Sequence, residues 1–446
     1  MNHTSRKGRA FRRGEVDPQT LVVFGSVMVI LVTLAILLFS GDGGYGGKLL
    51  LVVRSNVGFW VMLTVAVAFG IYRKVTNPDR FHWHELPVQL AVSLVVLLLL
   101  SCLFFSTSAN LSDTEIWNGH VTGAEYHEEW TERVTERYCN GHGSGKNRKT
   151  CSGCKTRTRR VYHDPYWIVN TTVSSLSVNS QTYRNVVSHF GNERKIDLFH
   201  SGQVSVGDGD KFETTFNPSQ AERLIPASDS RSFVNYLQAS ESVKKIRGHG
   251  QLFPELIRPY PQVYAGRFGH LEIDRVIDAG VGLPATWKRT VDRALEEALV
   301  QLGHRKQVNV IVYAAKTADQ TFAYALDQAW NKGKKNDVIV VLGLDAFPKV
   351  SFAHVMAWTK VEQFPINLRN RILEMPNLSD GKALASAIVE EISKPASQGG
   401  FERTPMSDLE YLIADIELPM WAQILIVLLG GAASWGTSSF LIRNDF

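Results

Sequence analysis

Four stretches of this chain are apolar enough to dissolve in a lipid bilayer, and they constrain its fold more than any other feature. They cover residues 21–39, 49–72, 87–105 and 420–442. An α-helix needs about 20 apolar residues to cross roughly 30 Å of hydrocarbon. Helices of globular proteins rarely stay apolar on every face over such a length. The sequence therefore predicts a multi-span α-helical membrane protein with a large polar region, residues 107–418, between its third and fourth spans.

Two of the stretches carry residues that need a specific environment. Arg54 and Asn56 lie near the start of the second stretch. Because a charged side chain is costly in hydrocarbon, Arg54 is expected to extend to the membrane interface or to face another part of the protein. The fourth stretch contains the small residues Gly430, Gly431 and Ala432, which favour close packing of helices.

The basic residues that flank the short loops predict the orientation in the membrane. Cytoplasmic loops carry an excess of lysine and arginine. This excess assigns the amino-terminal tail, residues 1–19, and the loop between the second and third spans to the cytoplasm. The polar region is then extracytoplasmic and the tail, residues 443–446, is cytoplasmic. The residues that carry this prediction are Arg6, Lys7, Arg9, Arg12, Arg13, Arg73, Lys74 and Arg80.

Charge and length limit the functions and the number of domains that the polar region can have. The net charge is +5 over 446 residues, and basic residues are mixed with acidic ones, so the composition gives no support for nucleic-acid binding. The expected partners are the lipid bilayer, membrane or envelope proteins, and copies of the same chain. The polar region is longer than most single domains. We expect a β-rich module at residues 107–262, an α/β domain at residues 263–400 and a linker at residues 401–418.

A cluster of cysteine and histidine opens the β-rich module. Cys139, His142, Cys151 and Cys154 form two close pairs with the spacing C-x2-H-x8-C-x2-C. Two such pairs can close a tetrahedral zinc site, since thiolates and imidazoles are the usual ligands of structural Zn²⁺. The flanking residues, 121–138 and 155–168, are rich in strand-forming types and predict a hairpin. One interpretation is a structural zinc knuckle at the turn of that hairpin.

The predicted compartment favours a second interpretation of the same cysteines. Thiols outside the cytoplasm tend to oxidise, so Cys139 could pair with Cys151 or Cys154, or the last two with each other. The basic residues around the cluster could contact phosphates or anionic lipid, although such runs are more often a solvated surface. These residues are Lys146, Arg148, Lys149, Lys155, Arg157, Arg159 and Arg160.

The rest of the β-rich module shows short alternating segments. Strands are predicted at residues 171–178, 183–187, 203–206 and 211–216. Residues 207–210 predict a tight turn. Asp208 and Asp210 in this turn suggest a calcium loop, but the other oxygen ligands are missing, so a hairpin turn is the favoured interpretation.

After about residue 266 helices alternate with apolar strands, which predicts an α/β layer. Helices are expected at residues 284–302, 318–330 and 381–392, where apolar residues recur at helical spacing. Strands are expected at residues 308–313 and 338–342. The second of these strands is wholly apolar, which is typical of a sheet covered on both faces.

The order of these elements resembles the TPM domain family, over roughly residues 274–394. The resemblance rests on the opening sequence Val276-Ile277-Asp278-Ala279-Gly280-Val281-Gly282-Leu283-Pro284 and on Trp330-Asn331-Lys332-Gly333-Lys334-Lys335-Asn336-Asp337-Val338-Ile339-Val340-Val341. Members of the family have been associated with acid phosphatase activity, with divalent-cation binding, and with the assembly and repair of membrane complexes. This chain departs from the family pattern because it has Asp337 and Val338 where a glycine is usual.

The resemblance implies candidate catalytic residues. Asp278, Asp337 and Asp345 lie at strand ends or turns, where α/β sheets place their ligands. An acidic pocket there could hold a divalent cation that positions a phosphate ester and activates water. The same aspartates are equally suited to capping helices and turns. No serine-hydrolase, P-loop or zinc-protease motif is present in the sequence.

Two functions remain as hypotheses. The first is a noncatalytic, membrane-anchored assembly or scaffolding protein whose outward domain binds partners or copies of itself. The second is a divalent-metal-dependent, phosphatase-like hydrolase that acts at the membrane surface.

Overall fold

The computed structural model describes residues 18–39, 44–109, 111–139, 154–196, 209–240, 252–269 and 271–444. The chain divides into two compact units. We call them the helical unit (Met1–Thr114, Ser232–Gly248 and Thr404–Phe446) and the sheet unit (Glu115–Arg231 and His249–Arg403).

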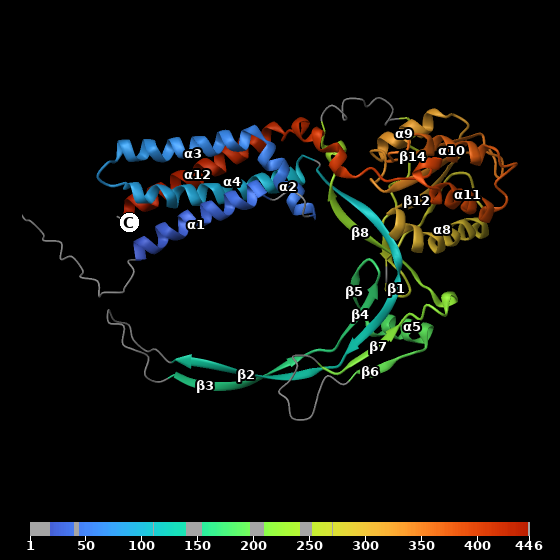
Figure 1. The fold of residues 1–446 in the computed structure, drawn as a ribbon, viewed down its shortest axis with the longest axis horizontal. Helices are drawn as coiled ribbons and strands as arrows, with labels where there is room; N and C mark the ends of the chain where they lie inside the picture. Colours follow the sequence, from blue (N-terminus) through green and yellow to red (C-terminus); the bar gives the residue numbers. More distant parts are fainter. Residues whose placement is uncertain are drawn as a thin grey trace, which may run out of the picture. The chain divides into compact units, whose positions relative to one another are not determined.

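Within the described residues, the helical unit contains four helices that are long and apolar enough to cross a membrane. They are α1 (Pro18–Phe39), α3 (Val57–Thr76), α4 (Leu86–Thr107) and α12 (Met420–Asn444), drawn in blue and red in Figure 1. Their number agrees with the four apolar stretches of the sequence.

The second stretch does not form the single span predicted at residues 49–72. It is divided between α2 (Gly44–Ser55) and α3, and Asn56 caps the start of α3 by accepting a hydrogen bond of 3.2 Å from the backbone N–H of Phe59. Asparagine is far more stable at a helix start than in an apolar helix interior. Arg54 therefore lies in α2, outside the apolar helix, and donates a hydrogen bond to the carbonyl of Leu38 at 2.6 Å.

A buried glutamine joins three of the apolar helices. Gln89 of α4 is fully buried, and its Nε2 donates to the carbonyl of Ala66 in α3 at 3.2 Å and to the hydroxyl of Ser434 in α12. Gly70 of α3 packs directly against this side chain, because a Cβ atom there would lie 2.3 Å from Gln89 Oε1. Polar bonds of this kind hold helices together in a bilayer, where apolar contact with lipid is as favourable as contact with protein.

Short segments outside the apolar helices complete the helical unit. The predicted linker at residues 401–418 contains a 3-10 helix, η4 (Met406–Asp415), and Glu410 of η4 forms an ion pair of 2.6 Å with Lys48 of α2. Asp415 accepts a hydrogen bond from Ser240, which follows α6 (Tyr236–Ala239). Asn235, at the start of α6, donates to Asp113 at 2.9 Å. These contacts join all three chain segments of the unit.

The larger sheet of the sheet unit is built around one long strand, β1 (Ser112–His127). Its strand order is β5-β4-β1-β8-β10-β9, and β7 also pairs with β1 and with β6. The other strands are β4 (Tyr166–Thr171), β5 (Ser175–Val178), β6 (Arg194–Ile196), β7 (Lys211–Thr215), β8 (Pro226–Val234), β9 (Tyr264–Ala265) and β10 (Leu271–Glu272).

Helix α5 (Ser180–Phe190) packs on this sheet, so the predicted strand at residues 183–187 is wrong. Asn179 caps the start of α5, and Gly191 ends it in a left-handed conformation, φ 70°. Tyr183, Val186 and Phe190 recur at helical spacing and are buried against the sheet. The predicted strand at residues 211–216 is observed as β7, whereas the one at residues 203–206 lies outside the described residues.

The predicted hairpin is present as a two-stranded antiparallel ribbon of β2 (Trp130–Cys139) and β3 (Cys154–His163), drawn in green in Figure 1. Its turn, residues 140–153, lies outside the described residues.

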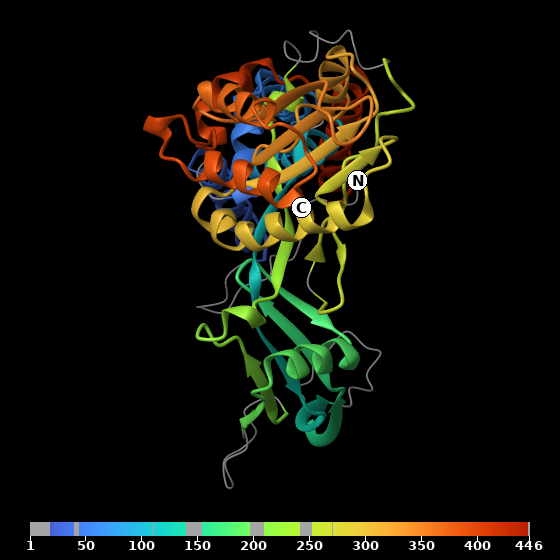
Figure 2. The same cartoon turned by 90° about the vertical axis from the view of Figure 1, so that its right-hand side faces the viewer.

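The second sheet has the order β11-β12-β13-β14. β11 (Val276–Ala279), β12 (Asn309–Ala315) and β13 (Asp337–Gly343) are parallel, and β14 (Phe352–Ala357) is antiparallel to β13. On one face pack α8 (Ala285–Lys306), α10 (Gln363–Leu373) and α11 (Gly381–Ser393), and on the other packs α9 (Thr321–Ala329). Figure 2 shows this layer in yellow to orange. The α/β layer predicted from the sequence is therefore confirmed.

Candidate functional site

The three predicted aspartates do not gather in one pocket. Asp278 lies at the carboxyl end of β11 and Asp345 just beyond the carboxyl end of β13, whereas Asp337 is the first residue of β13. The strands are parallel, so Asp337 lies at the opposite edge of the sheet from the other two. A catalytic set composed of all three aspartates is therefore incompatible with the strand directions.

Asp278 is engaged by its own turn. Its Oδ1 accepts hydrogen bonds from the backbone N–H groups of Val281 at 2.9 Å and Gly282 at 3.2 Å, and its Oδ2 accepts one from Leu283 at 2.7 Å. A carboxylate has about four acceptor positions, so most of them are already filled. Gly282 adopts φ 79°, which allows the backbone to curl around the carboxylate. Asp345 is exposed and accepts a hydrogen bond from Ser351 at 3.3 Å.

Asp337 is fully buried and belongs to a polar network. It accepts hydrogen bonds from the backbone N–H of Lys334 at 2.7 Å, from Asn309 Nδ2 at 2.9 Å and from the hydroxyl of Tyr260 at 3.0 Å. Burial raises the pKa of Asp337 to about 6, although these hydrogen bonds oppose the shift. The residue is therefore held inside the sheet unit rather than presented to a substrate.

The centre of this network is Arg275, which the sequence analysis did not single out. Its side chain is only 1% exposed. Nη1 donates to Asn309 at 2.5 Å, while Nη2 donates to Asn118 at 2.7 Å and to Ser228 at 3.0 Å. Burial lowers the pKa of Arg275, and nearby acidic groups, Glu296 first, oppose that shift. A buried arginine requires such partners, because leaving its charge unsolvated and unpaired is very costly.

The network joins the two sheets of the sheet unit. Asn118 belongs to β1 and Ser228 to β8 of the larger sheet, whereas Asn309 belongs to β12 of the second sheet. Asn118 also donates from Nδ2 to the carbonyl of Val308 at 3.0 Å. No local sequence pattern marks these residues, since each contacts residues more than 100 positions away or on a separate strand.

An open cavity of about 700 Å³ lies beside the network. Helix α8 supplies Asp292 and Glu296 to its wall, and Glu272 comes from β10. Burial raises the pKa of Glu296 to about 7, and the neighbouring Asp292 raises it further. Burial also raises the pKa of Asp292, whose Oδ1 accepts a hydrogen bond of 2.9 Å from the backbone N–H of Arg275. Groups with such perturbed pKa values occur often at functional sites, and also in structural networks.

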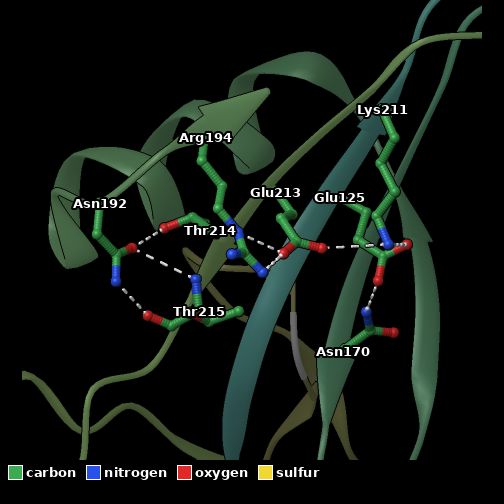
Figure 3. Close-up of polar contacts among 8 residues, drawn as sticks. All are labelled: Glu125, Asn170, Asn192, Arg194, Lys211, Glu213, Thr214 and Thr215. Atoms are coloured by element: carbon green, nitrogen blue, oxygen red, sulfur yellow. Dashed lines mark hydrogen bonds and ion pairs between the residues drawn. The ribbon is translucent and has the colours of Figure 1, made fainter. Parts of the chain in front are cut away.

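A third group of polar residues lies on the larger sheet, shown in Figure 3. Glu125 of β1 lies directly opposite Glu213 of β7, and Lys211 contacts both carboxylates, at 3.0 and 3.3 Å. Arg194 of β6 also pairs with Glu213. Burial lowers the pKa of Lys211, whereas its contacts with Glu125 and Glu213 raise it. The net shift of the pKa is upward. The cations thus offset the repulsion expected between two facing glutamates.

The cysteine cluster is only partly within the described residues. His142 and Cys151 lie outside them. Cys139 and Cys154 close the described part of the ribbon, where the strand register makes them direct partners. Among the described residues, no group of three or more His, Cys, Asp or Glu side chains is placed to hold a metal ion.

The chain was also compared with known proteins. No family model, no curated protein and no solved structure matches it.

Proposed function

We propose that this chain is an integral, multi-pass membrane protein whose sheet unit forms a fixed extracytoplasmic platform for assembly, either with membrane or envelope proteins or with copies of itself. In this proposal both termini lie in the cytoplasm and residues 107–418 lie outside it, as the positive residues of the short loops indicate.

One observation carries the proposal. The helical unit is built from three segments of the chain and the sheet unit from two, so the chain passes between the units four times. A domain joined by several chain segments stays within the reach of the shortest of them, whereas a domain on one long linker can move further away. Multiple connections to a membrane unit suit a protein that holds partners in place better than one that must follow a soluble substrate.

The interior of the sheet unit supports the same function. Arg275, Asn118 and Asn309 join its two sheets through buried hydrogen bonds. Buried hydrogen bonds of this kind favour one arrangement of the groups they join, and here both Nη atoms of Arg275 are bonded while its Nε has no partner among the described residues. Of the functions associated with the TPM family, which the sequence resembles, membrane-complex assembly fits this rigidity best.

The hydrolase hypothesis receives less support. Asp278 is engaged by three backbone N–H groups, and Asp337 lies at the other edge of the sheet. A cation that activates water requires open carboxylate oxygens. Asp345 is exposed, but it would have to act without the other two aspartates.

The assembly function is tested on the full chain extracted in mild detergent from its native membrane. We expect a particle heavier than one chain and its micelle, and no release of phosphate from an aryl phosphate ester with either Mg²⁺ or Mn²⁺. A monomer with metal-dependent hydrolysis that is abolished in Asp345→Asn would overturn the proposal. Asp319→Asn, an exposed aspartate bonded to Thr321 at the start of α9, is the matched control for that substitution.

The orientation is tested separately with trypsin added to sealed, right-side-out membrane vesicles. The ribbon exposes Arg133 and Arg160, so we expect cleavage there and protection of a tag fused to the amino terminus. Protection of the ribbon together with loss of the tag would reverse the assigned orientation.

A further inference from the structure

We propose that one face of the β2–β3 ribbon binds the head groups of anionic phospholipids. We call it the arginine face. It consists of alternate residues of the two strands: Thr131, Arg133, Thr135, Arg137, Thr156, Thr158, Arg160 and Tyr162.

The strand register places these residues together. In antiparallel strands alternate side chains share one face, and partners across the strands lie side by side. Arg133 faces Arg160, and Arg137 faces Thr156. All three arginines are exposed. They therefore form one contiguous set that a flat surface can reach.

The two faces of the ribbon differ in how their charges are balanced. On the opposite face Arg159 pairs with Glu136 at 2.9 Å, and His163 lies 3.3 Å from Glu132. The arginine face carries no acidic residue in the described part of the two strands. Glu129, which precedes β2, accepts a hydrogen bond from Tyr162 at one end of the arginine face.

Two arginines placed directly opposite each other repel, which destabilises the sheet unless a counterion lies between them. Within the described residues no hydrogen bond or ion pair joins Arg133 or Arg160 to another side chain. A phosphate group supplies the missing charge, because the planar guanidinium presents two parallel N–H donors that match two phosphate oxygens. The threonine hydroxyls between the arginines add further donors.

The composition of the face favours lipid over an acidic protein as the occupant. Protein interfaces depend on apolar or aromatic anchors that fill pockets on the partner. Besides threonine and arginine, the described part of the arginine face carries one aromatic residue, Tyr162, whose hydroxyl is bonded to Glu129, and the aliphatic residues Val134 and Val161 lie on the other face. A single tyrosine of this kind is also suited to the interface of a membrane, where its ring and its hydroxyl meet different surroundings. Head-group binding requires only charge and hydrogen-bond donors. The described part of the chain also contains four helices long and apolar enough to cross a membrane, so a bilayer is an expected partner of this protein.

The test uses the full chain in nanodiscs of phosphatidylcholine, held on a sensor surface. Vesicles of phosphatidylcholine alone, or containing phosphatidylserine, are passed over it. We expect binding only to the vesicles with phosphatidylserine, weakening as salt is raised. The triple variant Arg133→Gln, Arg137→Gln, Arg160→Gln should weaken this binding about 100-fold, since each arginine near an anionic surface contributes a factor of about five.

The matched control removes the same number of cations from the other face: Lys155→Gln, Arg157→Gln, Arg159→Gln. It should weaken binding much less than the arginine-face variant. Equal losses in the two variants, or equal binding to both kinds of vesicle, would overturn the proposal. Tighter binding of polyglutamate than of phosphatidylserine vesicles would assign the face to an acidic protein instead. If the triple variant fails to fold, Arg133→Gln and Arg160→Gln alone provide the same comparison with Arg157→Gln.

Discussion

Arg275 donates a hydrogen bond of 2.5 Å from Nη1 to Oδ1 of Asn309, at the point where the two sheets of the sheet unit meet. Both side chains are buried, and Nδ2 of Asn309 in turn donates a hydrogen bond to Oδ1 of Asp337. The stability of the unit therefore depends on a charged group that has no access to water.

Replacing Arg275 with methionine is expected to lower the free energy of unfolding by about 3 kcal/mol, because it leaves Asn118, Asn309 and Ser228 buried without their shared donor. Unfolding of the full chain in detergent, followed by tryptophan fluorescence in urea, measures the change. Arg293→Met is the control. Arg293 lies on the exposed side of α8 in a pair with Glu297, so its loss should change stability by less than about 1 kcal/mol. Similar values for the two variants would contradict a central role for Arg275.

The raised pKa of Glu296 predicts how the free energy of unfolding varies with pH. Its pKa in the folded chain is about 7, above the value of about 4.3 for an unfolded chain. The folded state therefore holds an extra proton between these pH values, and the free energy of unfolding falls as the pH rises from about 4 to about 7. Asp337 changes stability in the same direction, since its pKa is also raised.

The variant Glu296→Gln removes the first of these contributions. It should be more stable than the wild type by about 3 kcal/mol well above pH 7, since each pKa unit corresponds to about 1.4 kcal/mol, and equal to it near pH 4. Unfolding curves recorded across this pH range measure both differences. Glu297→Gln, one position further along α8, is the control: Glu297 is the smallest of the causes that raise the pKa of Glu296, so this substitution should change the pH dependence much less than Glu296→Gln does. A variant Glu296→Gln whose stability parallels the wild type at every pH would show that the carboxyl is not perturbed.

Periodicity explains which elements could be predicted from the sequence. The first, third and fourth apolar stretches, the helix α8 and the apolar strand β13 are long or strongly patterned, and their residues alone define them, whereas the second stretch is divided at Asn56. Residues 183–187 show the limit of that method. Tyr183, Val186 and Val187 suit a strand as well as a helix, and the decision is made by the Asn179 cap and by burial of Phe190 against the sheet.

The buried network could not be predicted because its residues carry no local signal. Arg275 resembles any surface arginine in sequence, and only the pairing of β11 with β12 places it beside Asn309. The strand-end rule identified Asp278, Asp337 and Asp345 as a group. It did not distinguish the start of β13 from its end, and that distinction separates Asp337 from the other two.

The facing glutamates of the larger sheet give a prediction that can be measured as a coupling energy. Lys211→Met should destabilise the sheet unit by about 1 kcal/mol, because Glu125 and Glu213 then repel each other across the strands. Glu125→Gln in the same background should recover most of that loss. A double-mutant cycle on the full chain measures the coupling. Additive effects of the two substitutions would mean that Lys211, as drawn in Figure 3, does not bridge them.

The close contact of Gly70 with Gln89 predicts the effect of one methyl group in the helical unit. In Gly70→Ala the new Cβ would lie 2.3 Å from Gln89 Oε1 and 2.4 Å from Leu86 Cδ1. Gln89 must then give up its bonds to Ala66 and Ser434, at a cost of about 1 kcal/mol. The melting temperature in detergent should fall. Gly25→Ala on α1 is the control, because no atom lies within 4 Å of its Cβ position, and an equal fall there would exclude a specific contact at Gly70.

The strand register of the ribbon leads to a prediction about whether Cys139 and Cys154 form a disulfide. Cys139 and Cys154 are direct partners across the strands, and the Cα atoms of such partners lie about 4.5–5.5 Å apart, within the range of disulfides. In the proposed extracytoplasmic compartment we expect this pair to be oxidised. The chain has four cysteines, so denaturation without reductant should leave two thiols that react with an alkylating reagent, and metal analysis should find no zinc.

The zinc knuckle predicts the opposite result on the same sample. Four thiols would then react after denaturation, and about one zinc per chain would be released. Cys154→Ser leaves the same number of reactive thiols in both states, and it reports only on the loss of the cross-link or of the metal. With a disulfide it frees the thiol of Cys139, so three thiols react and the melting temperature falls as the ribbon loses its cross-link. With zinc, the same substitution removes the metal and leaves three thiols, so the zinc content of the wild type decides between them.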